Sequence, residues 1–244
     1  MNGWGITDKG RQREGNEDFF IMNVLMEKNL LFAVVCDGMG GASAGEVASR
    51  MAAQAFEQEI KRQIRPDMSR AYMCAAMASA VNAANDAVYL KAVSGEEFEG
   101  MGTTLAALLI EGEDGVIANV GDSRVYIIGD GAIKQATRDH SVVEEMINRG
   151  EITRKQARTH PGKNLITRVI GTDPAVDADT FEFTVRKDTF ILLCTDGLTN
   201  MLDEQEILQE VSQDGDPAEY CERLIASANR KGGDDNITVV LIQI

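Results

Sequence analysis

Four aspartates of this sequence lie where short apolar runs begin or end. A short apolar run that is bounded by turn residues is typical of a buried strand. Binding sites on a sheet scaffold are usually built at the ends of such strands. Clustered carboxylates repel one another and raise one another's pKa, and a bound cation relieves that repulsion. The sequence therefore predicts a metal site that is formed by Asp37, Asp122, Asp196 and Asp235.

The candidate ligands offer oxygen only, from carboxylates and from the backbone carbonyl of Gly38. Oxygen ligands suit hard cations such as Mg²⁺ or Mn²⁺ rather than Zn²⁺ or Cu²⁺. Gly38 has no side chain to keep a metal away from the backbone. Arg13 precedes the acidic pair Glu17 and Asp18, and a guanidinium beside a metal site is suited to bind a doubly charged phosphate. Two metal ions with an arginine can activate water and neutralise a phosphoryl group.

The composition is that of an acidic globular protein. The chain has 244 residues, of which 24 are basic and 39 acidic, so its net charge is −15. An acidic chain is not expected to bind nucleic acid, because neutralising phosphates takes a surface of lysine and arginine. No apolar stretch approaches the roughly 20 residues of a membrane span, and the first residues lack a signal-peptide pattern. The four cysteines form no Cys-x-x-Cys pair, which favours free thiols in a reducing compartment and a cytoplasmic location.

Apolar periodicity predicts the elements that must position these residues. Two helices, 45–64 and 69–93, follow the early strands, and two more begin after the capping residues Asp203 and Asp216. Strands that are joined mostly by short turns disfavour a doubly wound parallel sheet. We expect an α+β fold with two antiparallel sheets, each flanked by a helix pair, in a single domain of residues 1–244. The expected strands span 3–8, 18–25, 30–36, 103–110, 116–120, 124–128, 132–135, 181–185, 190–195 and 237–244.

Seven short motifs occur along the chain in a definite order. They are Arg13-x-x-Asn16-Glu17-Asp18, Asp37-Gly38-Met39-Gly40-Gly41, Met101-Gly102-Thr103-Thr104, Asn119-Val120-Gly121-Asp122-Ser123-Arg124, Asp139-His140-Ser141, Thr195-Asp196-Gly197-Leu198 and Asp235-Asn236. Each motif alone is weak. Together and in this order they resemble the protein phosphatase 2C family, the metal-dependent serine/threonine phosphatases. The resemblance runs from about Gly3 to the C-terminus.

The resemblance implies a four-layer α-β-β-α sandwich with a metal centre at one end of its two sheets. By the same likeness, Asp37 would bridge two Mn²⁺ or Mg²⁺ ions, and the carbonyl of Gly38 would complete one coordination sphere. Asp196 and Asp235 would complete the other sphere. Asp122 resembles the further aspartate that bacterial members use, together with Asp196, for a third ion.

Other residues are implied to support this centre. Glu17 and Asp18 resemble holders of metal-bound waters, and Asn236 belongs to the same supporting group. Arg13 matches the arginine that binds the substrate phosphate. Residues 140–170 match the flap of bacterial members, which lies beside the active site and is tied to substrate choice.

The implied reaction is hydrolysis of phosphoserine and phosphothreonine in proteins by a metal-bridging hydroxide. It would reverse the action of a serine/threonine kinase, so phosphorylated proteins and such a kinase are the implied partners. Eukaryotic members have a histidine, held to be the general acid, where this chain has Met39, and many bacterial relatives have methionine there. Ala42 offers no nearby substitute. We expect a water on the metal to donate the proton, rather than His140 or His160.

Two other functions are compatible with parts of the sequence. The glycine-rich loop 38–45, between a strand and a helix, imitates the phosphate-binding loop of a nucleotide-binding enzyme. The dinucleotide pattern G-x-G-x-x-G is incomplete, however, because Ser43 stands at its last position. A phosphatase-like binding module without activity is the second alternative, but it should lack the metal ligands that this chain keeps. Asp122 alone could also be a turn residue that pairs with Arg124.

Overall fold

Two antiparallel sheets form the centre of the structure. The computed structural model describes residues 1–25, 29–41 and 44–244. In the first sheet the strand order is β1-β11-β10-β7-β8, so the earliest and latest strands of the chain pair side by side. Its strands are β1 (Asn2–Asp8), β7 (Arg124–Gly129), β8 (Ala132–Gln135), β10 (Phe190–Cys194) and β11 (Ile237–Gln243).

The second sheet has the order β2-β3-β5-β6-β9, and the short strand β4 pairs with the end of β3. Along β3, Phe32 packs toward the helices, whereas Leu31 and Val35 pack toward the other sheet. Burial on both faces explains why this strand is apolar throughout instead of alternating. The strands are β2 (Asp18–Leu25), β3 (Leu30–Met39), β4 (Gly102–Thr103), β5 (Leu105–Glu111), β6 (Asp114–Val120) and β9 (Asp179–Thr184).

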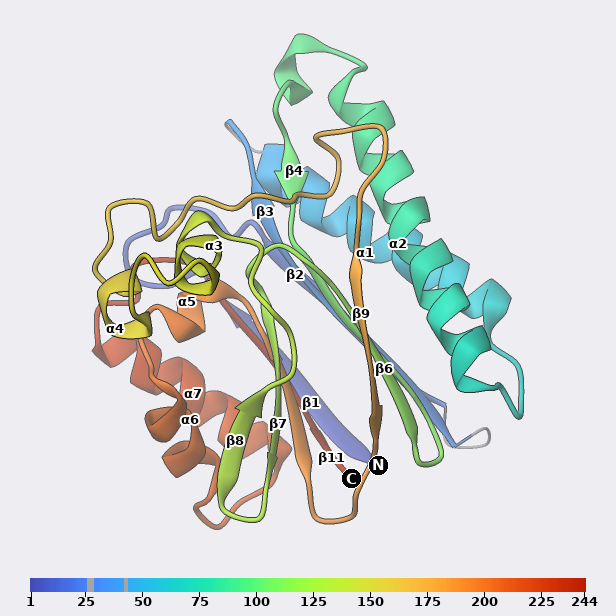
Figure 1. Ribbon diagram of the computed structural model, residues 1–244, viewed down its shortest axis with the longest axis vertical. Coiled ribbons are helices and arrows are strands. Elements are labelled where there is room, and N and C mark those ends of the chain that lie inside the picture. Colours follow the sequence, from blue (N-terminus) through green and yellow to red (C-terminus); the bar gives the residue numbers. More distant parts are fainter. Residues whose placement is uncertain (26–28, 42–43) are drawn as a thin grey trace.

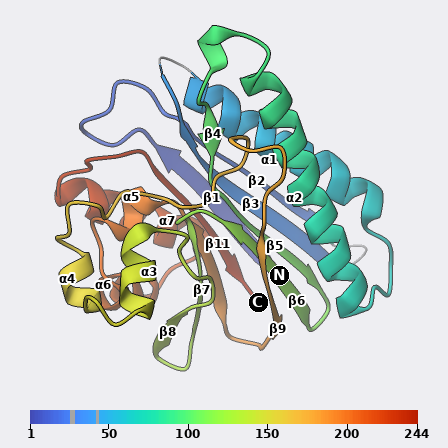
Figure 2. The ribbon, with the colours of Figure 1, turned by 45° about the horizontal axis from the view of Figure 1, so that its top comes forward.

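A helix pair covers the outer face of each sheet (Figure 1). Helices α1 (Ala44–Gln63) and α2 (Arg70–Ala92) pack on the second sheet, and the 3-10 helix η2 (Glu96–Phe98) follows them. Helices α6 (Glu204–Val211) and α7 (Pro217–Arg230) pack on the first sheet. The tilted view also shows the strands between the two helix pairs, which confirms the predicted α-β-β-α order (Figure 2). None of the helices in the described part of the chain combines the length and apolar character needed to cross a bilayer.

Capping residues determine where the helices begin. The Ser69 hydroxyl caps α2 by accepting a hydrogen bond from the backbone N–H of Tyr72. Asp203 and Asp216 cap α6 and α7, each in a capping box with a glutamate three residues later. Pro217 occupies the first turn of α7, where its missing N–H costs no hydrogen bond. These signals are local in the sequence, so the observed starts agree with the predicted ones.

The structure departs from the predicted elements near the candidate ligands. The sequence predicts that the third strand ends at Cys36, but β3 continues through Asp37 to Met39 because β4 pairs with its last residues. The predicted strand 103–110 is divided into β4 and β5. The short helix α5 (Asp196–Thr199) was not predicted. Asp37 therefore lies within β3, whereas Asp122, Asp196 and Asp235 lie beyond strand ends.

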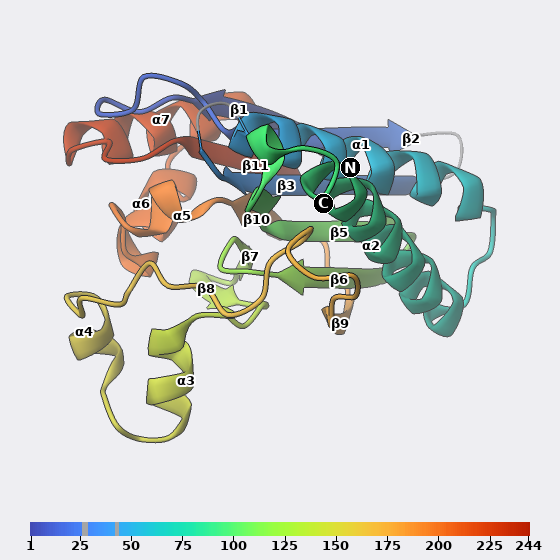
Figure 3. The same ribbon diagram turned by 90° about the horizontal axis from the view of Figure 1, so that it is seen from above.

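Residues 140–170 contain two short helices, α3 (Val142–Asn148) and α4 (Arg154–Ala157). Seen from above, these helices project from the layers on the side of α5 and α6 (Figure 3). A β-bridge between Ser141 and Ile166 joins the two ends of this segment. We call residues 140–170 the flap.

Candidate metal centre

The strand pairings bring the predicted acidic residues to one end of the two sheets. Antiparallel pairing of β2 with β3 places Asp18 opposite Asp37 in the second sheet. In the first sheet the end of β10 lies next to the start of β11, so Asp196 and Asp235 come to the same edge. Asp122 follows β6; its charge raises the pKa of Asp37, and the charge of Asp196 raises the pKa of Asp122. The structure therefore gathers residues that are far apart in the chain.

These carboxyl groups share an environment that disfavours their charged forms. Burial raises the pKa of Asp37 well above its usual range, and repulsion from Asp18, Asp196 and further carboxylates adds to it. Burial also raises the pKa of Asp18 to about 7, although hydroxyl hydrogen bonds lower it. The pKa values of Asp122 and Asp196 are raised by burial first and by neighbouring carboxylates second, although both side chains keep partial contact with solvent. Without a counter-charge, the group cannot be fully ionised near neutral pH.

Two carboxylate oxygens in this group are buried and have no hydrogen-bond partner among the described residues. They are Oδ1 of Asp18 and Oδ1 of Asp196. The second oxygen of Asp196 accepts a hydrogen bond from Asn200 Nδ2 at 2.9 Å. An unpaired buried polar atom costs about 1–3 kcal/mol, so these oxygens indicate a missing partner. A hard divalent cation would satisfy them and would also neutralise the surrounding charge.

The side chains as they stand do not enclose an ion. In the described ranges, no group of three or more His, Cys, Asp or Glu residues has the arrangement of a formed metal site. Asp235 is engaged by Arg13, and Asp196 lies close enough to Asp37 for their carboxyl groups to interact. The charge, burial and oxygen donors fit Mg²⁺ or Mn²⁺, and binding would require these contacts to open.

Arg13 reaches the centre from the loop between β1 and β2. Its Nη2 donates a hydrogen bond to Asp235 Oδ2 at 2.8 Å, and its side chain is half exposed. The ion pair gives Asp235 a counter-charge. An exposed guanidinium at this position can turn toward a phosphate once a metal ion occupies the carboxylates.

Asn236 holds the loop that carries Arg13 and Glu17. Its Nδ2 donates to the backbone carbonyls of Lys9 and Gly15, both at 2.9 Å. Its Oδ1 accepts from the backbone N–H of Glu17 at 2.8 Å. All of its side-chain contacts shown here go to backbone atoms of this loop, so its role is to shape the loop beside the acidic group.

Gly38 and Gly45 allow Glu17 and the start of α1 to approach β3 closely. A Cβ on Gly38 would overlap the carbonyl of Gly45, and a Cβ on Gly45 would lie 2.7 Å from the Glu17 carboxylate. Burial raises the pKa of Glu17 against the opposing effect of Arg13. Close backbone packing is therefore a second reason for glycine at position 38, besides access of a metal to its carbonyl.

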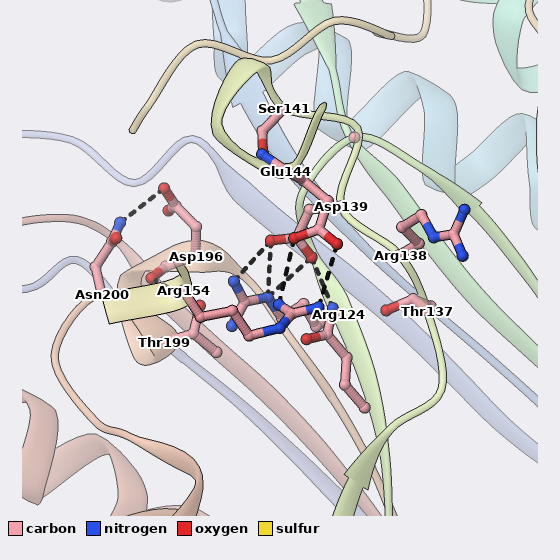
Figure 4. Close-up of polar contacts among 12 residues, drawn as sticks. Arg124, Thr137, Arg138, Asp139, Ser141, Glu144, Arg154, Asp196, Thr199 and Asn200 are labelled. Atoms are coloured by element: carbon pink, nitrogen blue, oxygen red, sulfur yellow. Dashed lines mark hydrogen bonds and ion pairs between the residues drawn. The ribbon is translucent and has the colours of Figure 1, made fainter. Parts of the chain in front are cut away.

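Asp122 lies in a turn that begins at Gly121, whose φ of +100° favours glycine. The alternative is that Asp122 serves as a partner of Arg124, whose charge does lower the pKa of Asp122, but the hydrogen bonds of that guanidinium go to Asp139 and Tyr126 (Figure 4). Its Nη2 lies 2.6 Å from Asp139 Oδ2, and its Nη1 donates to the hydroxyl of Tyr126 at 3.0 Å. Asp122 thus remains available to the acidic centre.

A cavity of about 650 Å³ adjoins the centre between the flap and helices α5 and α6. Asp122 and Asp196 of the centre line it, as do Glu144 and Arg154 of the flap. In Figure 4, Arg154 is joined to Glu144, and Asp196 is joined to Asn200. A cavity of this volume can accept a side chain with flanking residues of a polypeptide.

Some residues around the centre were not predicted as part of the site. Asp139 is the partner of Arg124, and the hydroxyls of Thr195 and Thr238 contact Asp18. Each lies in or near one of the seven motifs, and this was the only indication in the sequence that it could belong to the site. Their contacts join positions up to 220 residues apart, and no local spacing reveals them.

Comparisons with known proteins agree with this fold. The family model described as Protein phosphatase 2C matches residues 9–238. The serine/threonine phosphatase Stp of Listeria monocytogenes is 38% identical over 238 residues, which cover 97% of this chain and 93% of that protein. The structure of Stp1 from Staphylococcus aureus covers 100% of this chain and 95% of its own, with a TM-score of 0.92 and 34% identity. The catalytic domain of PstP, solved with two manganese ions, covers 98% and 96%, with a TM-score of 0.85 and 33% identity.

The fold and the acidic centre define a metal-dependent protein phosphatase. The chain belongs to the protein phosphatase 2C family. The alternative of an inactive binding module is not supported, because the relatives are named as phosphatases and the chain keeps its acidic group. The nucleotide-binding alternative is weakened because β3 runs through Gly38 to Met39, where a phosphate-binding loop would begin. Residues 42–43 of that loop lie outside the described residues.

Proposed function

We propose that this chain hydrolyses phosphoserine and phosphothreonine in proteins at a centre of two Mn²⁺ or Mg²⁺ ions, with a third ion at Asp122. The observation that carries the proposal is the buried acidic group, with unpaired oxygens on Asp18 and Asp196, at one end of both sheets. The likeness to a phosphatase solved with two manganese ions supports it.

The ligand assignment follows the position of each oxygen. Asp37, with the adjacent carbonyl of Gly38, comes from the second sheet, and Asp196 and Asp235 come from the first. By the family likeness, Asp37, the Gly38 carbonyl, Asp196 and Asp235 would hold two ions, and Asp122 with Asp196 would hold the third. When bound, divalent cations lower the pKa of water and stabilise charge on a phosphoryl group.

The other residues bind and orient the substrate. Arg13 would leave Asp235 and bind the phosphate oxygens, and the adjoining cavity would hold the flanking polypeptide. Asn236 would keep the Arg13 loop in place for this contact.

We expect that neither histidine protonates the leaving seryl oxygen. His140 Nδ1 accepts the backbone N–H of Gly121 at 3.2 Å, so the proton of the neutral ring lies on Nε2, which is 3.3 Å from Asp179 Oδ2. His160 Nδ1 accepts from the backbone N–H of Gly162 at 3.1 Å. Both rings therefore have structural hydrogen bonds, and we expect solvent at the metal centre to supply the proton.

We also propose that residues 1–244 form one catalytic domain that acts in the cytoplasm on the targets of a serine/threonine kinase. Side chains of both sheets share one apolar core, which supports a single domain. The four cysteines are free, which accords with a reducing compartment. The acidic charge of −15 argues against nucleic acid as a partner.

The direct test is turnover of a phosphoserine peptide by the purified chain. We expect activity with added Mn²⁺, its loss with a chelator, and its return when excess Mn²⁺ is restored. The histidine variants His140→Gln and His160→Gln should each keep kcat within about tenfold, because a general acid is worth roughly 10²–10⁴-fold. Full turnover in the presence of chelator would refute the metal-dependent reaction.

A further inference from the structure

We propose that Thr195 and Thr238 are positioning residues of the metal centre, which orient Asp18 and hold the two sheets at the separation that shared metal ions require. The proposal rests on the proposed function, because it concerns the same centre. It adds a set of hydroxyl groups, called here the threonine clamp, that consists of Thr7, Thr195 and Thr238.

The clamp joins one sheet to the other. Asp18 begins β2 in the second sheet, whereas Thr238 lies in β11 of the first sheet and Thr195 directly follows β10. The hydroxyl of Thr195 donates to Asp18 Oδ2 at 2.8 Å, and that of Thr238 donates to the same oxygen at 2.7 Å. Asp18, Thr195 and Thr238 are all buried. Two directional bonds thus cross from the first sheet to a single carboxylate of the second.

The surrounding hydrogen bonds determine the direction of each donor. A carboxylate only accepts, so Thr238 must give its hydroxyl hydrogen to Asp18. Thr7 lies 2.7 Å from Thr238 and must therefore donate to it. Thr7 in turn accepts from Asn16 Nδ2 at 2.8 Å. Thr195 accepts the backbone N–H of Thr238 at 3.0 Å, which leaves its own hydrogen for Asp18. Thr195 and Thr238 thus both donate to Oδ2 of Asp18, and Thr7 donates to Thr238.

The two carboxylate oxygens of Asp18 have different surroundings. Oδ2 accepts both hydroxyls, whereas Oδ1 is buried and unpartnered among the described residues. Partial rotation of the carboxylate would break both bonds, and a half turn would only exchange its two equivalent oxygens, so one oxygen always faces away from the clamp. Oδ1 is therefore kept free for the metal centre, opposite Asp37 in the strand register.

The sheet separation matters because the ligands come from both sheets. Asp37 belongs to β3, and Asp196 and Asp235 flank β10 and β11. Elsewhere the sheets meet through apolar side chains, which attract without directional preference. The clamp supplies directional contacts at the end where the ligands lie. Its loss should therefore weaken metal binding more than it weakens the fold.

Titration calorimetry with Mn²⁺ tests the clamp directly. Thr195→Val and Thr238→Val keep the side-chain shape and remove the hydroxyl. We expect each to weaken the tighter Mn²⁺ binding by about tenfold or more, the size of effect seen when groups that orient metal ligands are removed. Thr238→Ser should restore binding, because serine keeps the hydroxyl. The exposed strand residue Thr180, replaced by valine, is the matched control and should bind Mn²⁺ like the wild type.

Steady-state kinetics should also show that the valine substitutions affect Mn²⁺ binding and not substrate binding. The activating Mn²⁺ concentration should rise in the valine variants, while KM for a phosphopeptide at saturating Mn²⁺ stays near the wild-type value. A lower melting temperature with unchanged Mn²⁺ affinity would show that the threonines are only structural, and would overturn the proposal.

A milder variant covers the case in which the buried substitutions do not fold. Thr7 is exposed on one side, so Thr7→Val should fold, and it should weaken Mn²⁺ binding by roughly threefold because it acts through Thr238. Unchanged affinity in Thr7→Val would then overturn the clamp. If the wild type itself bound no Mn²⁺, the proposed function would fail instead, so the two failures are distinguishable.

Discussion

The metal centre and the flap are neighbouring regions that neutralise acidic residues in different ways. In the flap, Glu144 pairs with Arg154 at 3.2 Å and Glu145 pairs with Arg149 at 3.3 Å. In the centre, several carboxylates crowd together, and Arg13 forms an ion pair with one of them. The flap thus contains its own counter-charges, whereas the centre depends on cations from solution. The difference separates a segment shaped by protein contacts from a site built to bind metal.

Removing the charge of a metal ligand should have the largest effect on activity. Asp37→Asn, Asp196→Asn and Asp235→Asn should each lower kcat by at least about a hundredfold, because charge stabilisation by a metal is worth several kcal/mol. The same changes should not destabilise the metal-free protein at neutral pH, since each removes a repelling charge. Steady-state kinetics and thermal unfolding measure the two effects.

The control for these variants is Asp130→Asn in the turn between β7 and β8. Asp130 is exposed and has a φ of +52°, which asparagine also adopts readily. It should keep wild-type kcat. Wild-type rates in any of the three ligand variants at saturating Mn²⁺ would remove that residue from the ligand set.

The pH dependence of stability should reverse between metal-free and metal-bound protein. Folding raises the pKa of Asp18 to about 7 through burial, so the folded state binds more protons than the unfolded state from about pH 4 to pH 7. The stability this proton contributes is complete below that window and is lost as pH rises through it. Mn²⁺ replaces the proton as counter-charge, so its gain in Tm should be larger near pH 7.5 than near pH 5. Calorimetric scans with equal gains at both values would contradict this account.

Replacing Arg13 should have an intermediate effect on activity, smaller than the loss of a metal ligand. Arg13→Ala should raise KM for a phosphopeptide by roughly tenfold, because a hydrogen bond to a charged group is worth about 1.5–3 kcal/mol. The change in kcat should be smaller, since a phosphate clamp contributes mainly to binding. Arg11→Ala removes the same charge from an exposed position of the same loop and serves as the control. An equal KM in both variants would exclude Arg13 from phosphate binding.

The exposed ion pairs of the flap should have the smallest effect. Arg149 and Glu145 are one helical turn apart, and both side chains are more than half exposed. Arg149→Gln should change the free energy of unfolding by less than about 0.5 kcal/mol. Chemical denaturation measures that change, and a loss comparable to that of a buried pair would show that the flap is held more tightly than its exposure indicates.

The sequence gives good information on elements whose signals are local. The bounds of β2 agree with the predicted strand 18–25, and α7 begins at Pro217 behind its cap. The candidate ligands could also be predicted, because they occur in motifs that follow one another along the chain in the order of the family. The flap was predicted only as a partly helical segment, and its base contact between Ser141 and Ile166 has no local signal.

The sequence by itself determined the acidic residue types, their places next to apolar strands and the capping of the helices, because each depends on residues a few positions apart. Tertiary structure decided that β3 extends beyond Cys36, since Asp37 pairs with Asp18 of β2 and the last two residues pair with β4. It also decided that Arg124 binds Asp139 and that Thr195 and Thr238 meet at Asp18. These contacts arise when two sheets pack together, and the burial and repulsion that favour a metal ion exist only after that packing is complete.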